Sequence, residues 1–169
     1  MQFIYLSAAV HFGEQPKADF RYSALFNKRR LARSFQNRNL LQSRFSEKVF
    51  KFEIEAPLIA KARKAGHFVI VRVGEKGERM PLTIAGADPV KGTITLVVQE
   101  VGLSSTRLCH LNEGDYITDV VGPLGKATHI EKFGTVVCAG GGVGVAPMLP
   151  IIEACLLYTS PKPTRRTPI

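Results

Sequence analysis

The sequence lacks the cysteine pattern of a stapled or zinc-bound domain. Its three cysteines, Cys109, Cys138 and Cys155, show no CxxC spacing. An odd number without paired spacing argues against a disulfide framework and a closed zinc site. We therefore expect a reducing, cytoplasmic setting, with thiols that fill space as small apolar groups.

Long apolar runs are also missing. No stretch approaches the roughly 20 apolar residues that a membrane-spanning helix needs, so no membrane partner is expected. The opening "MQFIYLSAAVHF" has an apolar patch, but no basic region precedes it. It is therefore a poor candidate for a secretory signal.

Basic charge is scarce where a folded nucleic-acid-binding surface would need it. The net charge is +9, but residues 1–44 hold 8 Lys and Arg against 2 Asp and Glu. Residues 45–152 hold 12 against 11, and residues 153–169 hold 3 against 1. Since a nucleic-acid-binding domain carries its basic stripe on the folded part, we expect no nucleic-acid partner.

Recognisable acid–base or metal-binding patterns are absent too. We find no convincing Ser-His-Asp set or carboxylate pair, and the histidines lie in separate contexts without companions at metal-ligand spacing (His67, His110, His129). We interpret them as structural or exposed, and predict no metal ligands.

Both ends of the chain differ from its centre. Residues 1–42 form a basic extension, and the stretch "FNKRRLARSFQNRNLLQSR" (residues 26–44) is Arg-rich and acid-poor, as in an organellar transit peptide. A start codon assigned too early explains the segment equally simply, and we favour that reading. Residues 159–169 contain Pro161, Pro163 and Pro168, which oppose helix. Both ends are expected to be disordered.

Residues 43–132 are strand-rich. In "VFKFEIEAP", Phe50, Phe52 and Ile54 alternate with charged residues, which is the period of a half-buried strand. The stretches "HFVIVRV", "PLTIA", "TITLVVQEV" and "DYITDVVG" are similar, and turn residues separate them. Helical inserts are expected around "LIAKARKA" and "STRLCHL". The fold class is mainly β, a small antiparallel Greek-key barrel.

Residues 133–158 predict the first strand–loop–helix unit of an incomplete α/β nucleotide-binding domain. "GTVVCAG" resembles a buried strand, and the glycine loop "GGGVG" then precedes an apolar helix. Glycines there let backbone N–H groups approach a pyrophosphate. No Lys-Ser/Thr follows, and GxGxxG is matched poorly, so a tight structural turn remains an open alternative.

The motifs "GERMPLTIAGAD", "VVQEVG", "LNEGD", "GPLG" and "GGGVGVAP", in this order, resemble the ferredoxin–NADP reductase superfamily. The resemblance spans about residues 43–152. Within that superfamily, the sequence most resembles the branch that contains the small flavin-bearing subunit of NADH-dependent ferredoxin:NADP oxidoreductase and the electron-transfer subunit of dihydroorotate dehydrogenase.

The resemblance implies FAD on the barrel and NAD(P)H on the second unit. Thr83 would be the catalytic hydroxyl facing the reactive edge of the flavin, with Pro81 and Leu82 beside it. Arg79 would meet the diphosphate, although it precedes Thr83 by four residues where the family has three. A one-residue offset turns a strand side chain to the other face, so a bulge at Pro81 or a solvated Arg79 are both open.

Further cofactor contacts follow from the same resemblance. A barrel strand would line the ribityl chain and ring, a hydroxyl-rich helix start would hold the FAD phosphates as well as cap the helix, and the glycine loop would bind the nicotinamide nucleotide. The residues are, respectively, Val97, Val98 and Gln99; Gly102, Ser104, Ser105 and Thr106; and Gly140, Gly141, Gly142, Gly144 and Pro147.

The implied function is an electron-transfer flavoprotein subunit, an NAD(P)H-dependent flavin oxidoreductase joined to a larger catalytic subunit. Full-length relatives hold a [2Fe–2S] cluster whose cysteine ligands are absent here, and the chain looks truncated. The alternative is a cofactor-free barrel that binds a partner through an exposed helix face (Ile151, Ile152, Leu156, Leu157).

Overall fold

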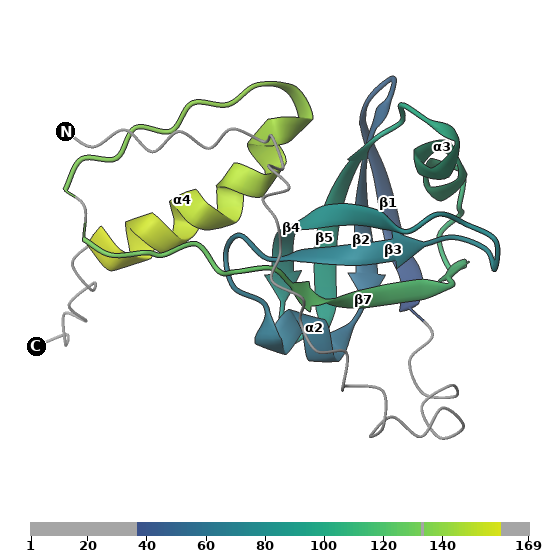
Figure 1. Ribbon diagram of the computed structural model, residues 1–169, viewed down its shortest axis with the longest axis horizontal. Coiled ribbons are helices and arrows are strands. Elements are labelled where there is room, and N and C mark those ends of the chain that lie inside the picture. The colour runs from purple at the N-terminus through teal and green to yellow at the C-terminus, as the bar shows by residue number, and fades with distance from the viewer. Residues whose placement is uncertain (1–36, 133, 160–169) are drawn as a thin grey trace, which may run out of the picture.

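The computed structural model describes residues 37–132 and 134–159. Seven strands form one sheet, which Figure 1 shows curled into a barrel beside a single long helix. The strands are β1 (Asn37–Ser46), β2 (Val49–Glu55), β3 (Phe68–Arg72), β4 (Met80–Asp88), β5 (Thr93–Gln99), β6 (Tyr116–Ile117) and β7 (Asp119–Leu124). The short helices are α2 (Pro57–Ala62) and α3 (Leu103–Cys109).

The strand order is that of a Greek key. The sheet runs β6-β1-β2-β5-β4-β3-β7, and every pair is antiparallel. Strands β3, β4 and β5 form a meander, and β2, which precedes them in the chain, lies beside β5 and not beside β3. This is the Greek-key arrangement. The two outer strands of this order, β6 and β7, are separated in the chain only by Thr118. The sheet is therefore nearly closed on itself, and the predicted antiparallel Greek-key barrel is confirmed.

Alternation of side chains builds the core. Phe52 and Ile54 on β2 are fully buried. Their partners on β5, Leu96 and Ile94 respectively, are fully buried too. Intervening residues such as Lys51 point outward and remain partly exposed. The barrel interior is thus filled by side chains, as expected for a small barrel.

The two short helices cover openings of the barrel. Helix α2 begins with a proline at its first position, where the missing N–H has no cost, and it buries Ile59 and Ala60 in the core. Helix α3 buries Leu108 and Cys109 in the same cluster. Their predicted positions, around 58–65 and 105–111, are confirmed with small shifts at the ends.

The barrel begins earlier than its sequence indicated. Residues 37–46 form β1, which pairs with both β2 and β6, so the boundary placed at residue 43 falls inside a strand. Asn39 is fully buried, and its Nδ2 donates to the Asn112 carbonyl at 3.1 Å. Its backbone N–H donates to the Asp115 carbonyl and its carbonyl accepts from Gly114 N. The polar, basic composition of β1 concealed a strand that is fixed by long-range backbone hydrogen bonds.

The strand predicted at residues 134–140, before the glycine loop, is not formed. Residues 134–140 form no strand, and Val137 and Cys138 are exposed. A strand needs a neighbour for its backbone groups, and no described strand lies beside this segment. The predicted helix is confirmed: the 3₁₀ turn η1 (Gly142–Gly144) leads directly into α4 (Val145–Thr159).

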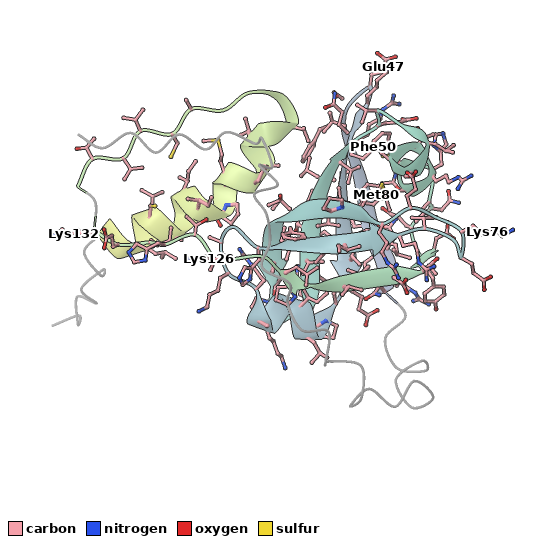
Figure 2. All side chains as sticks on the ribbon, in the orientation of Figure 1. Glu47, Phe50, Lys76, Met80, Lys126 and Lys132 are labelled. Atoms are coloured by element: carbon pink, nitrogen blue, oxygen red, sulfur yellow. The ribbon has the colours of Figure 1, made fainter. Side chains whose placement is uncertain are left out.

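Helix α4 lies beside the barrel on the side of β4 (Figure 1). Its N-terminal end is the end nearer the barrel, and the helix runs away from it. Lys126 and Lys132 mark the segment that leaves β7 toward α4 (Figure 2). Among the described residues, no helix is long and apolar enough to cross a membrane. The predictions for residues 1–36 and 160–169 lie outside the described residues.

Candidate functional site

A largely apolar groove of about 650 Å³ separates the outer face of the barrel from the start of α4. The barrel side is formed by the outward residues of four strands, and the other side by the end of the glycine loop and the first turns of α4. The lining residues are Phe45, Ser46, Val49, Lys51, Ala85, Thr95, Val97 and Gln99, with Gly142, Val143, Val145, Ala146 and Leu149.

The strand period decides which predicted residues reach this groove. Val97 and Gln99 point outward from β5 and line it, whereas Val98 between them is 3% exposed and belongs to the core. Two consecutive residues of a strand face opposite sides, so Val98 has only its backbone to offer to a ligand. Val97 is paired across the sheet with Lys51, and Gln99 with Val49.

A second groove, of about 640 Å³, continues the first on the side of α3. It is polar, with two basic and two acidic side chains. The lining residues are Arg44, Glu47, Lys48, Gln99, Glu100, Val101, Gly102 and Thr106. Glu47 stands at the tip of the β1–β2 hairpin (Figure 2). Gln99 lines both grooves, so the apolar and polar grooves meet at this residue.

Arg79, Pro81 and Thr83 are all exposed, whereas Met80 and Leu82 between them are half-buried and pack against the core. The alternation from Met80 to Thr83 is regular, without a bulge at Pro81. This half of β4 pairs with β3 and not with β5. A proline fits such an edge because it has no N–H to donate. The bulge considered at Pro81 is therefore absent, and Arg79, which directly precedes β4, is exposed as Thr83 is.

Thr83 is not among the residues that line the apolar groove. Ala85, two residues further along β4, lines the groove and is buried under α4. Two strand residues span about 6.7 Å. Leu82 is directed into the core, so its side chain does not face the groove.

The start of α3 is organised by Ser105. Its Oγ accepts hydrogen bonds from the backbone N–H groups of Val101 and Gly102, both at 3.0 Å, and donates to the Gly102 carbonyl at 2.9 Å. Ser105 is thus fully used as a cap, which is the simpler of its two predicted roles. Thr106 lines the polar groove instead.

Ser104 joins the loop before β4 to this helix start. Its Oγ donates to Glu78 Oε2 at 2.6 Å. The structure thus joins Glu78 to the start of α3, although Glu78 and Ser104 are 26 positions apart in the chain. A phosphate bound here would compete with Glu78 for the Ser104 hydroxyl.

The glycine loop leaves its backbone open. At Gly141, Gly142 and Gly144 an added Cβ would meet nothing within 4 Å. Gly142 also has a φ of +56°, a conformation that other residues rarely adopt. At Gly140 an added Cβ would collide with Met148 Sδ, so that glycine makes room for the helix. Only Gly142 of the predicted loop glycines lines a groove, and Pro147 lies within the first turn of α4.

The cysteines occupy different environments. Cys109 and Cys155 are buried, as expected of space-filling thiols, but Cys138 is exposed. Burial raises the pKa of the Cys109 thiol to about 11, and the negative charge of Glu100 adds to the effect. Within residues 37–132 and 134–159 there is no group of three or more His, Cys, Asp or Glu that could hold a metal ion.

Several lining residues were not foreseen, namely Arg44, Phe45, Val49, Lys51, Ala85 and Thr95. Lys51 and Thr95 carry an outward strand period that was visible in the sequence. What was missing was the pairing of β1, β2 and β5, which places their outward residues side by side.

The geometry just described is that of a ferredoxin reductase-type flavin-binding barrel, followed by a helix. The structure superposes on that of an NADH-dependent reduced ferredoxin–NADP oxidoreductase, studied for flavin-based electron bifurcation, with a TM-score of 0.73 and 41% identity. The superposition covers 75% of this chain and 46% of the other.

Curated sequences agree with this likeness. The chain is 46% identical over 111 residues to a dihydroorotate dehydrogenase B (NAD(+)) electron transfer subunit homologue of Thermotoga maritima, covering 66% of this chain and 39% of that protein. It is 30% identical over 105 residues to the dihydroorotate dehydrogenase B (NAD(+)) electron transfer subunit of Fusobacterium nucleatum, covering 59% of this chain and 40% of that protein. No family model matches the chain.

The chain is therefore similar in sequence to these electron transfer subunits, and similar in sequence and fold to the NADH-dependent reduced ferredoxin–NADP oxidoreductase. It spans about two-fifths of the length of the curated relatives it matches.

Proposed function

We propose that this chain carries FAD along the two joined grooves and serves in a subunit that passes reducing equivalents from NAD(P)H to a partner oxidoreductase. The observation that carries the proposal is the meeting of an apolar and a polar groove at Gln99. A dinucleotide flavin needs such a pair, because its ring is planar and mostly apolar while its diphosphate is charged.

The apolar groove suits the ring. Val97 and Ala85 line it with apolar side chains, Thr83 precedes Ala85 by two residues on β4, and the start of α4 forms its other side. The bound flavin would supply the redox chemistry, accepting a hydride and passing electrons on. The residues of this chain would orient the ring and exclude water, and Thr83 would offer a hydroxyl at the ring edge.

The polar groove suits the phosphates. Arg44 and Lys48 supply positive charge, Thr106 a hydroxyl, and Gly102 an open backbone with nothing within 4 Å of an added Cβ. Arg79, which follows Glu78 in the chain, would add a cation for the diphosphate, and Ser104 would add a hydroxyl once Glu78 releases it.

The nicotinamide is assigned to the glycine loop. The open backbone at Gly141, Gly142 and Gly144 would let it approach the apolar groove, which Gly142 also lines. The unit from residue 133 to residue 158 is thus proposed as the beginning of the NAD(P)H site. A larger catalytic subunit is the proposed partner, since the relatives are named as electron transfer subunits.

The test is the absorbance spectrum of the purified 169-residue chain, with the released cofactor identified by chromatography. We expect a flavin spectrum and FAD. Val97→Trp should fill the apolar groove and weaken FAD binding at least tenfold while the fold is kept, because Val97 points away from the core. The matched control is Val90→Trp, at a residue that is 97% exposed and lines neither groove.

A folded, colourless chain that does not bind added FAD would refute the proposal. It would favour the second candidate, a cofactor-free module that binds a partner protein through α4. That candidate rests on the exposed leucines Leu149, Leu156 and Leu157 of this helix. Ile151 does not belong to the exposed face, contrary to the prediction, because it is 6% exposed and faces the segments 128–130 and 136–139 that lie against α4.

A further inference from the structure

The apolar groove contains a single charged lining residue, Lys51. The twelve other lining residues are apolar, small or uncharged polar side chains. Lys51 projects from the outer face of β2, directly across from Val97 on β5, which is a wall of the groove. Its side chain is only 29% exposed, so its charge is less screened by water than that of a surface lysine.

The charge of Lys51 is balanced by one neighbour. Glu53, two residues along the same strand and on the same face, accepts a hydrogen bond from Lys51 Nζ at 2.8 Å. Glu53 does not line the groove. The ammonium group of Lys51 is therefore the charged group at the groove wall, whereas the compensating carboxylate of Glu53 lies outside the lining.

We propose that Lys51 sets the relative affinity of the groove for the reduced and oxidised flavin ring, and so the reduction potential of the bound flavin. The inference rests on the proposed function. When a neutral flavin takes a hydride from a dihydronicotinamide, the C–H bond of the donor breaks and its electron pair moves to the flavin. The flavin gains one negative charge and the donor becomes a nicotinamide cation. A fixed cation at the groove wall stabilises the charged product over the neutral ring.

The size of the effect follows from Coulomb's law. A lone unit charge several ångströms from another near a protein surface would change an equilibrium by more than tenfold, and the pairing of Lys51 with Glu53 reduces the expected effect to about tenfold. A tenfold change in the ratio of the two dissociation constants is about 30 mV for a two-electron couple. The ratio isolates the ring, because the phosphate charges are the same in both oxidation states.

The experiment measures the dissociation constants of oxidised FAD and of dithionite-reduced FAD, anaerobically at pH 8, for the full chain and its variants. Lys51→Met should weaken binding of reduced FAD about tenfold relative to oxidised FAD. Glu53→Gln should shift the ratio in the opposite direction, because it removes the counter-charge. Lys51→Arg keeps the positive charge and should therefore give the same ratio of dissociation constants as the unaltered chain. A role in packing alone would not predict this.

The matched control is Lys91→Met, since Lys91 is 71% exposed in its side chain and lines neither groove. It should leave the ratio unchanged. A flavin that binds to Lys51→Met with an unaltered ratio would overturn the role of Lys51 and leave the proposed function intact. Failure of the unaltered chain to bind either form of FAD would overturn both.

Discussion

The barrel and the α4 unit differ in where their apolar side chains go. In the barrel, alternation sends Phe52, Ile94 and Leu96 inward to a closed core and leaves the outer face mixed. Helix α4 is apolar on most of its surface, and it packs beside β4 with several leucines exposed. A helix that is apolar all round is normally buried in a larger structure. The barrel therefore buries its large apolar core residues within itself, whereas α4 presents apolar surface that its described contacts do not cover.

The largest expected effect is on the barrel core. Phe52→Ala should lower the free energy of unfolding by about 3–5 kcal/mol, because a fully buried phenyl ring is lost and a cavity remains. Urea denaturation followed by circular dichroism measures it. The matched variant Phe45→Ala, at a ring that is 63% exposed, should change stability by less than about 0.5 kcal/mol. Equal losses for the two variants would mean that the barrel is not the stable unit.

Thiol reactivity compares the two regions directly. The raised pKa of Cys109 means that its neutral thiol persists until the pH approaches about 11, so at pH 8 its thiolate population is about 100-fold below that of an ordinary cysteine. Cys138, which precedes the glycine loop, is exposed. Pulse labelling with iodoacetamide and peptide mapping should modify Cys138 first and Cys109 only at high pH or after unfolding. Rapid labelling of Cys109 at pH 8 would contradict the burial of α3 against the barrel.

The smallest effect is expected in the glycine loop. Gly142→Ala places a Cβ on a residue with φ of +56° and should cost about 1–2 kcal/mol locally. Hydrogen exchange should show this as faster exchange at the start of α4, with no change in β2 or β5. Gly141→Ala is the control, because its φ is −145° and an added Cβ meets nothing within 4 Å. A uniform loss of protection in both regions would show that they unfold as one unit.

Much of the barrel could be predicted because its signals are local. The period of two in residues 49–55 and the turn residues between strands predicted β2 to β5 and the short helices. Strand β1 was missed because its polar and basic residues carry no clear period, while its pairing with β2 and β6 is long-range. The segment 134–140 was wrongly predicted as a strand, since β-branched residues favour strands only where a neighbouring strand is present.

The candidate site divides in the same way. The sequence by itself determined which residue types are available: the glycine loop, the hydroxyl residues at the start of α3, and strands whose side chains alternate between two faces. Only the tertiary structure decided that Val98 faces the core, that Ser105 is used as a cap, and that Gln99 joins two grooves. The physical reason is that alternation fixes a side chain relative to its own strand, whereas grooves arise from residues of several strands and helices brought together by pairing and packing.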